Sequence, residues 1–243
     1  MNFTRLVILG TLLPVAAFAQ NLLQNSSFET VYESTGGGNY QVGTAHNIPL
    51  STNFGGAGYV DWWTYLGHGT LGGTDSYDST VEGSAQNGSR FVNFGGVVSP
   101  YDGSAAGGDV FQSFATQTGQ TYHVSFYARY YGTGVTSNNL IFRTEAVNVN
   151  TAGAISRLDL SPGGTNNLTD TWTAYSFDFV AGSTNSRLYF RDKTFSANGT
   201  NLDIQVDNAG VTLVSAIPEP ANYPILFAAA GLMFAFWARR RPA

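Results

Sequence analysis

Apolar and polar residues alternate along two segments of this chain. In residues 121–131 the side chains that share the apolar face are Tyr122, Val124, Phe126, Ala128 and Tyr130. Residues 171–180 alternate in the same way, and their shared face holds Thr173, Tyr175, Phe177 and Phe179. A period of two is that of a β-strand with one buried face. Both segments are therefore predicted to be strands.

Five further runs have the same apolar character and are bounded by Gly, Asn, Asp or Ser. They lie at residues 89–95, 109–115, 139–147, 186–192 and 201–214. No stretch between Gln20 and Ala216 keeps the helical period of 3.6. Two antiparallel sheets packed face to face are the simplest architecture for such strands, so an all-β, antiparallel β-sandwich is predicted.

The first 19 residues have the pattern of a signal peptide. Arg5 is the only charge among the first 28 residues, an apolar run spans 6–15, and Ala17-Phe18-Ala19 gives the small-x-small cleavage pattern. A short buried helix is the alternative, but Pro14 lies inside the run and would break a helix interior. We expect cleavage after Ala19 and export of the chain.

Residues 221–238 are uncharged and mostly apolar, and Arg239, Arg240 and Arg241 follow at once. As a helix this segment would reach about 27 Å, close to the hydrocarbon thickness of a bilayer. The positive-inside rule keeps the arginines cytoplasmic and the large N-terminal region across the membrane. A core helix is the alternative, but the segment has no polar stripe. A single C-terminal transmembrane helix is predicted at 221–238.

The motif Pro218-Glu219-Pro220 precedes this segment. Proline fixes its own φ and keeps the preceding residue extended, so the motif is a rigid, accessible peptide. Pro218, Glu219 and Pro220, then an apolar stretch, then the arginine cluster resemble the PEP-CTERM sorting signal of Gram-negative bacteria. This resemblance implies that a membrane-embedded exosortase processes the tail, residues 216–243, and passes the protein to the cell surface or to exopolysaccharide.

Composition and charge narrow the function classes. The 243 residues include 29 Gly, 17 Phe and 13 Tyr but only 11% charged residues, which is typical of many short strands joined by tight turns. The chain has no cysteine, so it has neither disulfides nor thiolate chemistry. Between Gln20 and Ala216 seven basic residues oppose fifteen acidic ones, a net charge of −8. With no basic stripe for a phosphate backbone, we expect no nucleic-acid binding.

Four motifs carry a second resemblance. They lie, in chain order, at residues 21–30, 88–96, 110–130 and 202–214. In that order they resemble the galactose-binding-like jelly rolls that include many carbohydrate-binding modules. The resemblance implies one jelly-roll domain over residues 20–215, between the signal peptide and the tail. Because this fold hosts many functions, sugar binding has to be argued from a site.

The jelly-roll resemblance also implies a calcium site. In such folds a calcium ion often ties the first strand to the last, and the matching acids here are Glu29, which follows residues 25–28, and Asp207. Calcium takes six to eight oxygens, which two carboxylates and backbone carbonyls would provide. The alternative is that both carboxylates only hydrogen-bond turns. The acidic group at 75–82 is expected to be a solvated loop.

Aromatic side chains are the candidates for sugar binding, because a pyranose ring stacks its C–H face on a flat ring. Residues 59–68 concentrate Tyr59, Trp62, Trp63, Tyr65 and His68. Adjacent tryptophans point to opposite faces of a strand, so one is expected in the core and the other exposed. The candidates are Trp62, Trp63, Tyr65 and, in the glycine-rich loop 99–109, Tyr101. Core packing of the whole cluster is the alternative.

The sequence shows no catalytic signature. His46, His68 and His123 lie far apart, and there is no H-E-x-x-H, G-x-S-x-G, P-loop or G-x-G-x-x-G motif. Fifteen acids leave a glycosidase-type carboxylate pair open. We therefore predict an exported, non-enzymatic surface protein that binds or structures extracellular polysaccharide. A glycan-active hydrolase or lyase, and a structural matrix protein without a defined ligand, remain alternatives.

Overall fold

The structure, a computed structural model, describes residues 20–36, 39–43, 47–49, 58–66, 72–78, 83–96, 108–132, 140–149, 153–193 and 202–214. The regular elements of these residues are all β-strands. In chain order they are β1 (Val31–Gly36), β2 (Asn39–Val42), β3 (Asn47–Pro49), β4 (Gly58–Val60), β5 (Thr64–Leu66), β6 (Gly72–Asp78), β7 (Arg90–Gly96), β8 (Asp109–Ala115), β9 (Thr121–Tyr131), β10 (Phe142–Asn148), β11 (Ala154–Leu160), β12 (Thr173–Val180), β13 (Asn185–Asp192) and β14 (Leu202–Leu213).

Several predictions concern parts of the chain outside these residues. They are the signal peptide at 1–19 and the tail at 216–243, with Pro218, Glu219, Pro220 and Arg239–Arg241. In the part that the structure describes, no helix has the length and apolar character needed to cross a bilayer.

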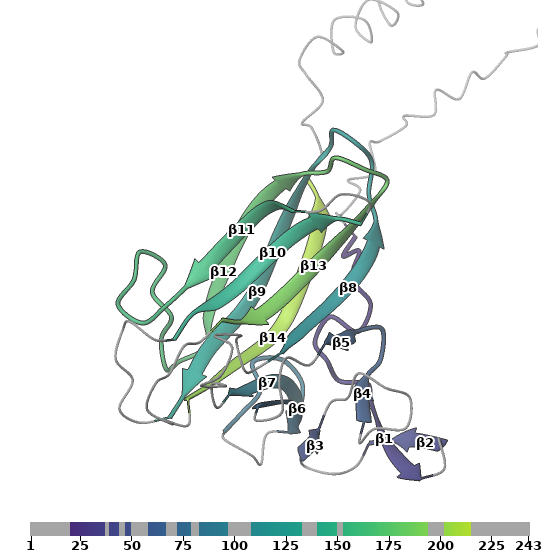
Figure 1. Cartoon of the computed structure of the whole chain (residues 1–243), viewed down its shortest axis with the longest axis vertical. Helices are drawn as coiled ribbons and strands as arrows, with labels where there is room; N and C mark the ends of the chain where they lie inside the picture. Colours follow the sequence, from purple (N-terminus) through teal and green to yellow (C-terminus); the bar gives the residue numbers. More distant parts are fainter. Residues whose placement is uncertain are drawn as a thin grey trace, which may run out of the picture.

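Two antiparallel sheets carry most of the strands (Figure 1). One sheet has six strands in the order β12-β9-β14-β7-β6-β3, and the other has five in the order β11-β10-β13-β8-β5. From β7 to β14 the chain passes repeatedly from one sheet to the other, as in jelly-roll sandwiches. The prediction of an all-β fold with two antiparallel sheets is confirmed.

A third, small sheet was not predicted. It has the order β2-β1-β4 and lies with the other short strands at one end of the sandwich (Figure 1). Strands β2 and β4 have four and three residues. Segments this short show no clear period of two, and the six residues of β1 do not alternate, so none of the three strands was predicted.

The two strongest alternating segments form the predicted strands with the predicted faces. In β9 the side chains of Tyr122, Val124, Phe126 and Ala128 are buried. In β12 Phe179 is buried and Tyr175 and Phe177 pack against the core, while the residues between them are exposed. These apolar faces meet between the two large sheets, where apolar burial stabilises the sandwich.

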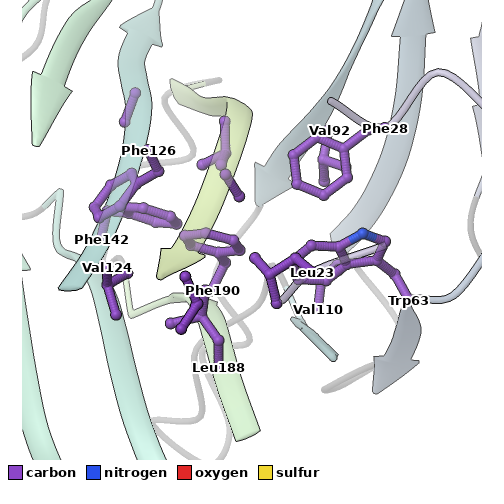
Figure 2. Close-up of a cluster of buried hydrophobic side chains, with 14 of the residues drawn as sticks. Leu23, Phe28, Trp63, Val92, Val110, Val124, Phe126, Phe142, Leu188 and Phe190 are labelled. Carbon is purple, nitrogen blue, oxygen red and sulfur yellow. The ribbon is translucent and has the colours of Figure 1, made fainter. Parts of the chain in front are cut away.

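Phe190 of β13 lies at the centre of the core (Figure 2). Its ring is stacked on Phe142 of β10, with centroids 6.0 Å apart, and meets Phe126 of β9 edge-on at 5.3 Å. On its other side it contacts Trp63 at 5.7 Å and Phe28 at 6.5 Å. The cluster therefore joins both large sheets to the N-terminal segment and to the turn before β5.

The N-terminal segment of the domain is held against β14 and β8. The Leu22 amide donates to the Val211 carbonyl at 2.8 Å, and the Val211 amide donates to the Asn21 side chain at 2.9 Å. The Gln24 amide donates to the side-chain oxygen of Gln112 at 2.7 Å, and the Gln112 amide group donates back to the Gln24 carbonyl at 2.9 Å. Residues 20–30 are thus fixed although they form no strand.

Candidate functional site

Glu29 holds the segment that leads into β7. One oxygen, Oε1, accepts hydrogen bonds from the amides of Ser89 and Arg90, both at 2.9 Å, and Oε2 accepts from the Ser89 hydroxyl at 2.8 Å. Gly88 lies directly against this carboxylate with φ +73°, and a Cβ at that position would overlap it. A glycine is therefore required for the segment to approach Glu29.

Asp207 of β14 holds the same segment a few residues earlier. Its Oδ2 accepts from the amides of Gln86 and Asn87, both at 2.8 Å, and its Oδ1 accepts from the amide of Asn208 at 2.6 Å. Burial raises the pKa of Asp207 to about 7, against the lowering effect of these three amides, and the charge of Glu29 raises it further. The charges of the two carboxylates therefore interact with one another.

The fit to calcium is partial. Each carboxylate keeps one oxygen that accepts a single hydrogen bond, Oε2 of Glu29 and Oδ1 of Asp207. Among the described residues, no group of three or more His, Cys, Asp or Glu side chains gathers to hold a metal. Two such oxygens are fewer than the six to eight that calcium takes, so backbone carbonyls would have to supply the rest. Calcium binding by this pair stays a prediction.

Trp63 and Trp62 have opposite environments. Trp63 is 6% exposed, its ring centroid lies 4.9 Å from that of Phe28, and its Nε1 donates to the Asn25 carbonyl at 3.2 Å. Trp62 is 64% exposed and has φ 70°. A positive φ is strained for a bulky side chain and is kept only where surrounding contacts impose it.

The strained backbone of Trp62 belongs to a turn, not to a strand. Residues 61 and 62 form the turn between β4 and β5. The turn is held by the side-chain amide of Asn25, which donates to the carbonyl of Asp61 at 3.1 Å, and by the Asp61 amide, which donates to Thr30 at 2.9 Å. One tryptophan is thus in the core and the other exposed, as predicted, but the turn and not strand alternation causes it.

The other two aromatic candidates differ from Trp62. Tyr65 lies in β5, is half-buried and packs against the core. Tyr101 lies outside the described residues. Of the four candidates, Trp62 is therefore the one for which the structure shows an open ring face.

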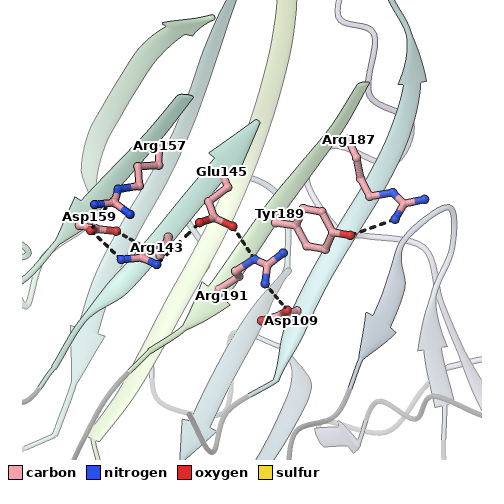
Figure 3. A network of polar contacts seen from close by, with 8 residues as sticks. All are labelled: Asp109, Arg143, Glu145, Arg157, Asp159, Arg187, Tyr189 and Arg191. Carbon is pink, nitrogen blue, oxygen red and sulfur yellow. Dashed lines mark hydrogen bonds and ion pairs between the residues drawn. The ribbon is translucent and has the colours of Figure 1, made fainter. Parts of the chain in front are cut away.

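Charged side chains gather on the outer face of the five-stranded sheet (Figure 3). We call this surface the arginine face, and its side chains are Asp109, Phe111 and Ser113 of β8, Arg187, Tyr189 and Arg191 of β13, Arg143 and Glu145 of β10, and Arg157 and Asp159 of β11. Strand register brings them together: Arg191 lies opposite Asp109 and Arg143, and Tyr189 lies opposite Phe111 and Glu145.

Ion pairs run across this face from β8 to β11. Arg191 lies 2.9 Å from Asp109 through Nη1 and 2.9 Å from Glu145 through Nε, although that N–H does not point at the carboxylate well enough for a hydrogen bond. Arg143 donates to both oxygens of Asp159, at 2.6 and 3.0 Å. This bidentate contact raises the pKa of Arg143 above its ordinary value.

Exposure increases across the network. The side chain of Asp109 is 2% exposed, whereas that of Arg157, at the β11 end, is 59% exposed. Buried ion pairs contribute little net stability but fix the orientation of their partners. The β8 end of the face is therefore the rigid end, and the β11 end is open to solvent.

Two arginines of the face lie over aromatic rings. The Arg187 guanidinium is 4.5 Å from the centre of the Phe111 ring, and that of Arg191 is 4.0 Å from the centre of the Tyr189 ring. The two rings are themselves in contact, with centroids 4.9 Å apart. Stacking of this kind holds a guanidinium plane in a defined orientation.

Trp62 lies at the β5 edge of the same sheet. It precedes Thr64 by two residues, and Thr64 pairs with Phe111 of β8. The arginine face could not be recognised from the sequence, because its residues are spread from 109 to 191 and only the strand register brings them together. Alternation within β13, with Arg187, Tyr189 and Arg191 on one side, was the one signal available.

A second stacked arginine lies on the outer face of the six-stranded sheet. The Arg129 guanidinium is 4.5 Å from the centre of the Trp172 ring and 5.7 Å from that of Phe91. Arg129 Nε donates to the side chain of Gln205 at 2.6 Å, and the Trp172 indole donates to the Ser84 carbonyl at 2.8 Å. This cluster packs the residues before β7 onto the sheet, on the side away from the arginine face.

His123 is the one histidine within the described residues. Its Nδ1 lies 2.6 Å from Asp178, at an exposed cross-strand position between β9 and β12. An exposed pair of this kind does not by itself make a catalytic site.

The fold is similar to carbohydrate-binding modules of known structure. A protein described as sugar-binding from Bacteroides thetaiotaomicron matches with 10% identity and a TM-score of 0.48, over 80% of this chain and all of its own. The module TmCBM61, in complex with β-1,4-galactotriose, matches with 12% identity and a TM-score of 0.46, over 80% and 99%. The xylan-binding domain CBM22-1 of Paenibacillus barcinonensis Xyn10C matches with 14% identity and a TM-score of 0.43, over 83% and 99%.

Neither a protein-family model nor a curated protein sequence matches this chain. At the identities and TM-scores above, the similar structures do not determine what this chain binds. The function therefore has to be argued from the side chains of the site.

The calcium prediction is tested by thermal unfolding. A calcium ion bound by Glu29 and Asp207 only in the folded state would stabilise it by about 2.7 kcal/mol at a hundredfold excess over the dissociation constant. Chelation is then expected to lower the melting temperature of the wild type and to leave that of Asp207→Ala unchanged. Identical wild-type melting curves with and without chelator would show that the two carboxylates only accept hydrogen bonds and bind no calcium.

The raised pKa of Asp207 predicts a pH-dependent stability. Because the folded-state pKa of about 7 lies above the ordinary value of 3.8, the contribution of this carboxyl is present in full below the ordinary value and is lost as the pH rises through the folded one. At about 1.4 kcal/mol per pKa unit, the loss is on the order of 4 kcal/mol.

Urea unfolding in chelator, from about pH 4 to about pH 8, measures this effect. We expect the free energy of unfolding of the wild type, taken relative to Asp207→Asn, to fall as the pH rises. A difference between the two proteins that does not change with pH contradicts the prediction.

Proposed function

We propose that this chain is an exported, non-enzymatic protein that binds extracellular polysaccharide through Trp62 and the arginine face. The observation that carries the proposal is the open indole of Trp62, which is 64% exposed and held in a strained turn next to the buried Trp63. Because the turn holds this ring in one position, the ring offers a ligand a flat apolar face that needs little further ordering. A pyranose ring, with a flat C–H face, fits that description.

The arginine face supplies what stacking alone lacks. Sugar hydroxyls are read by planar polar groups, and this surface presents guanidinium and carboxylate groups fixed by ion pairs and ring contacts. Its four longer strands, at about 4.8 Å spacing, make it about 14 Å across, wide enough for more than one sugar ring. Trp62 at its β5 edge would then hold one end of the bound glycan.

Binding, catalysis and a purely structural role predict different results. A glycan array tests binding, and release of reducing sugar from any glycan that binds tests for a hydrolase. Eliminative cleavage, read as new ultraviolet absorbance, tests for a lyase. Binding without product formation supports the proposal, whereas an array without signal supports a structural matrix protein.

The tail supports a proposal about destination. Pro218-Glu219-Pro220, the apolar residues 221–238 and the three arginines that follow resemble, in this order, the parts of a PEP-CTERM sorting signal. We infer that the chain is held in the membrane by this segment after export and that an exosortase then processes it. Surface polysaccharide is the ligand that a protein delivered in this way would meet.

Substitution of each tryptophan tests the binding site. We expect Trp62→Ala to weaken polysaccharide binding by about 1–3 kcal/mol, by analogy with base stacking on aromatic side chains, and to leave the melting temperature nearly unchanged. Isothermal calorimetry with the polysaccharide found on the array, paired with a melting curve, measures both.

Trp63→Ala is the matched control. Its ring lies in the core, so its truncation is expected to cost about 3–5 kcal/mol of folding free energy and to affect binding only through the fold. Unaltered affinity in Trp62→Ala would place the sugar site elsewhere.

Processing of the tail is tested by mass spectrometry of surface-exposed protein. In a host that has the sorting enzyme, the mature form is expected to lack Arg239, Arg240 and Arg241. Replacing Pro218 and Pro220 by alanine removes the rigid motif and is expected to leave the tail uncut. Surface protein that ends in the three arginines would exclude processing by this route.

A further inference from the structure

The arginine face differs in charge from the rest of the domain. Between residues 20 and 216 the chain has seven basic side chains against fifteen acidic ones. Four of those seven, all arginines, lie on this face, together with three carboxylates (Figure 3). The face therefore carries a net charge of +1 on a domain whose net charge is −8. This segregation of charge would favour an anionic glycan over a neutral one.

Three of the four arginines are already paired with carboxylates. Arg191 contacts Asp109 and Glu145, and Arg143 and Arg157 both contact Asp159. Their charges are largely balanced within the sheet.

Arg187 is different. Its Nε donates to the hydroxyl of Ser113 at 3.0 Å, and its Nη1 donates to the hydroxyl of Tyr189 at 2.9 Å. Both partners are neutral, and no carboxylate of the described residues forms an ion pair with it. A guanidinium has five N–H donors, so these two bonds leave three unused.

The unpaired guanidinium is also pre-oriented. It lies 4.5 Å above the Phe111 ring, and its bonds to the two hydroxyls fix its rotation. A planar guanidinium with free N–H groups on one edge matches a carboxylate in a bidentate manner. Because Arg187 lies opposite Ser113 of β8, it is also near the β5 edge where Trp62 lies.

From this arrangement we propose that the arginine face selects an acidic polysaccharide and that Arg187 binds the carboxylate of a uronic acid residue. The inference rests on the proposed function and names the ligand class of the same surface. Trp62 would stack on a sugar ring, and Arg187 would bind the carboxylate that distinguishes a uronic acid from a neutral sugar.

The test compares polymers that differ only in charge. Polygalacturonate and alginate are each measured against their own methyl esters by calorimetry, because esterification removes the carboxylate charge and keeps the backbone. We expect the wild type to bind at least one acid form about tenfold or more tightly than its ester. We also expect added salt to weaken binding of the acid form more than that of the ester.

Variants locate the effect. Arg187→Met removes the charge and keeps a stem to cover Phe111, and is expected to lose the preference for the acid form. Arg187→Lys keeps the charge without the planar fork and is expected to retain part of it. Arg129→Met is the matched control, because it removes the same charge from a guanidinium 4.5 Å above a ring on the other sheet. It is expected to leave the preference unchanged, and a melting curve of each variant checks folding.

The outcomes separate the two proposals. Equal affinity for acid and ester, binding of neutral glycans alone, or binding of sulfated but not uronate polymers overturns the carboxylate site and leaves polysaccharide binding standing. A preference for the acid form that survives in Arg187→Met, or disappears in Arg129→Met, removes the assignment to Arg187. Absence of binding to every polymer and to the glycan array contradicts both proposals.

Discussion

The rest of the structure depends on the packing of aromatic rings around Phe190. The ring meets side chains from both large sheets, from the N-terminal segment and from the turn before β5. Since aromatic rings of this size dominate the burial of apolar surface, one cluster fixes the distance between the sheets and the place of the turn. With Trp63 buried in this cluster, the turn at residues 61 and 62 leaves Trp62 outside the core. The exposed indole is thus a consequence of core packing and does not depend on a flexible loop.

The outer surface of the five-stranded sheet is organised by different forces. In an ion pair such as that between Arg191 and Asp109, the cost of removing both charges from water offsets most of their attraction. Such a pair therefore fixes the positions of its side chains and adds little to the stability of the fold. Ring contacts do the same for Arg187. A surface built in this way is rigid before any ligand arrives, and rigidity reduces the entropy that binding has to overcome.

The sandwich could be predicted from the sequence because a strand with one buried face alternates between apolar and polar residues, as β9 and β12 do. Sequence reasoning also placed one tryptophan of the pair in the core. It did not predict the arginine face or the third sheet, because β2 and β4 are short and β1 does not alternate between apolar and polar residues. The contact between Arg191 and Asp109 joins residues 82 positions apart, and only the pairing of β13 with β8 creates it. Local patterns record which face is buried but not which strands are neighbours.

The hydrogen bonds of Asn21 and Leu22 to Val211 place the N-terminal segment beside the last strand of the sandwich. Entry and exit of the chain therefore lie next to each other. A domain whose ends are adjacent can be inserted into a surface loop of another protein without disturbing its sheets. It can also be circularly permuted, with a short linker between the old ends and new termini in a loop. The same adjacency means that a tether attached at one of these ends also restrains the other.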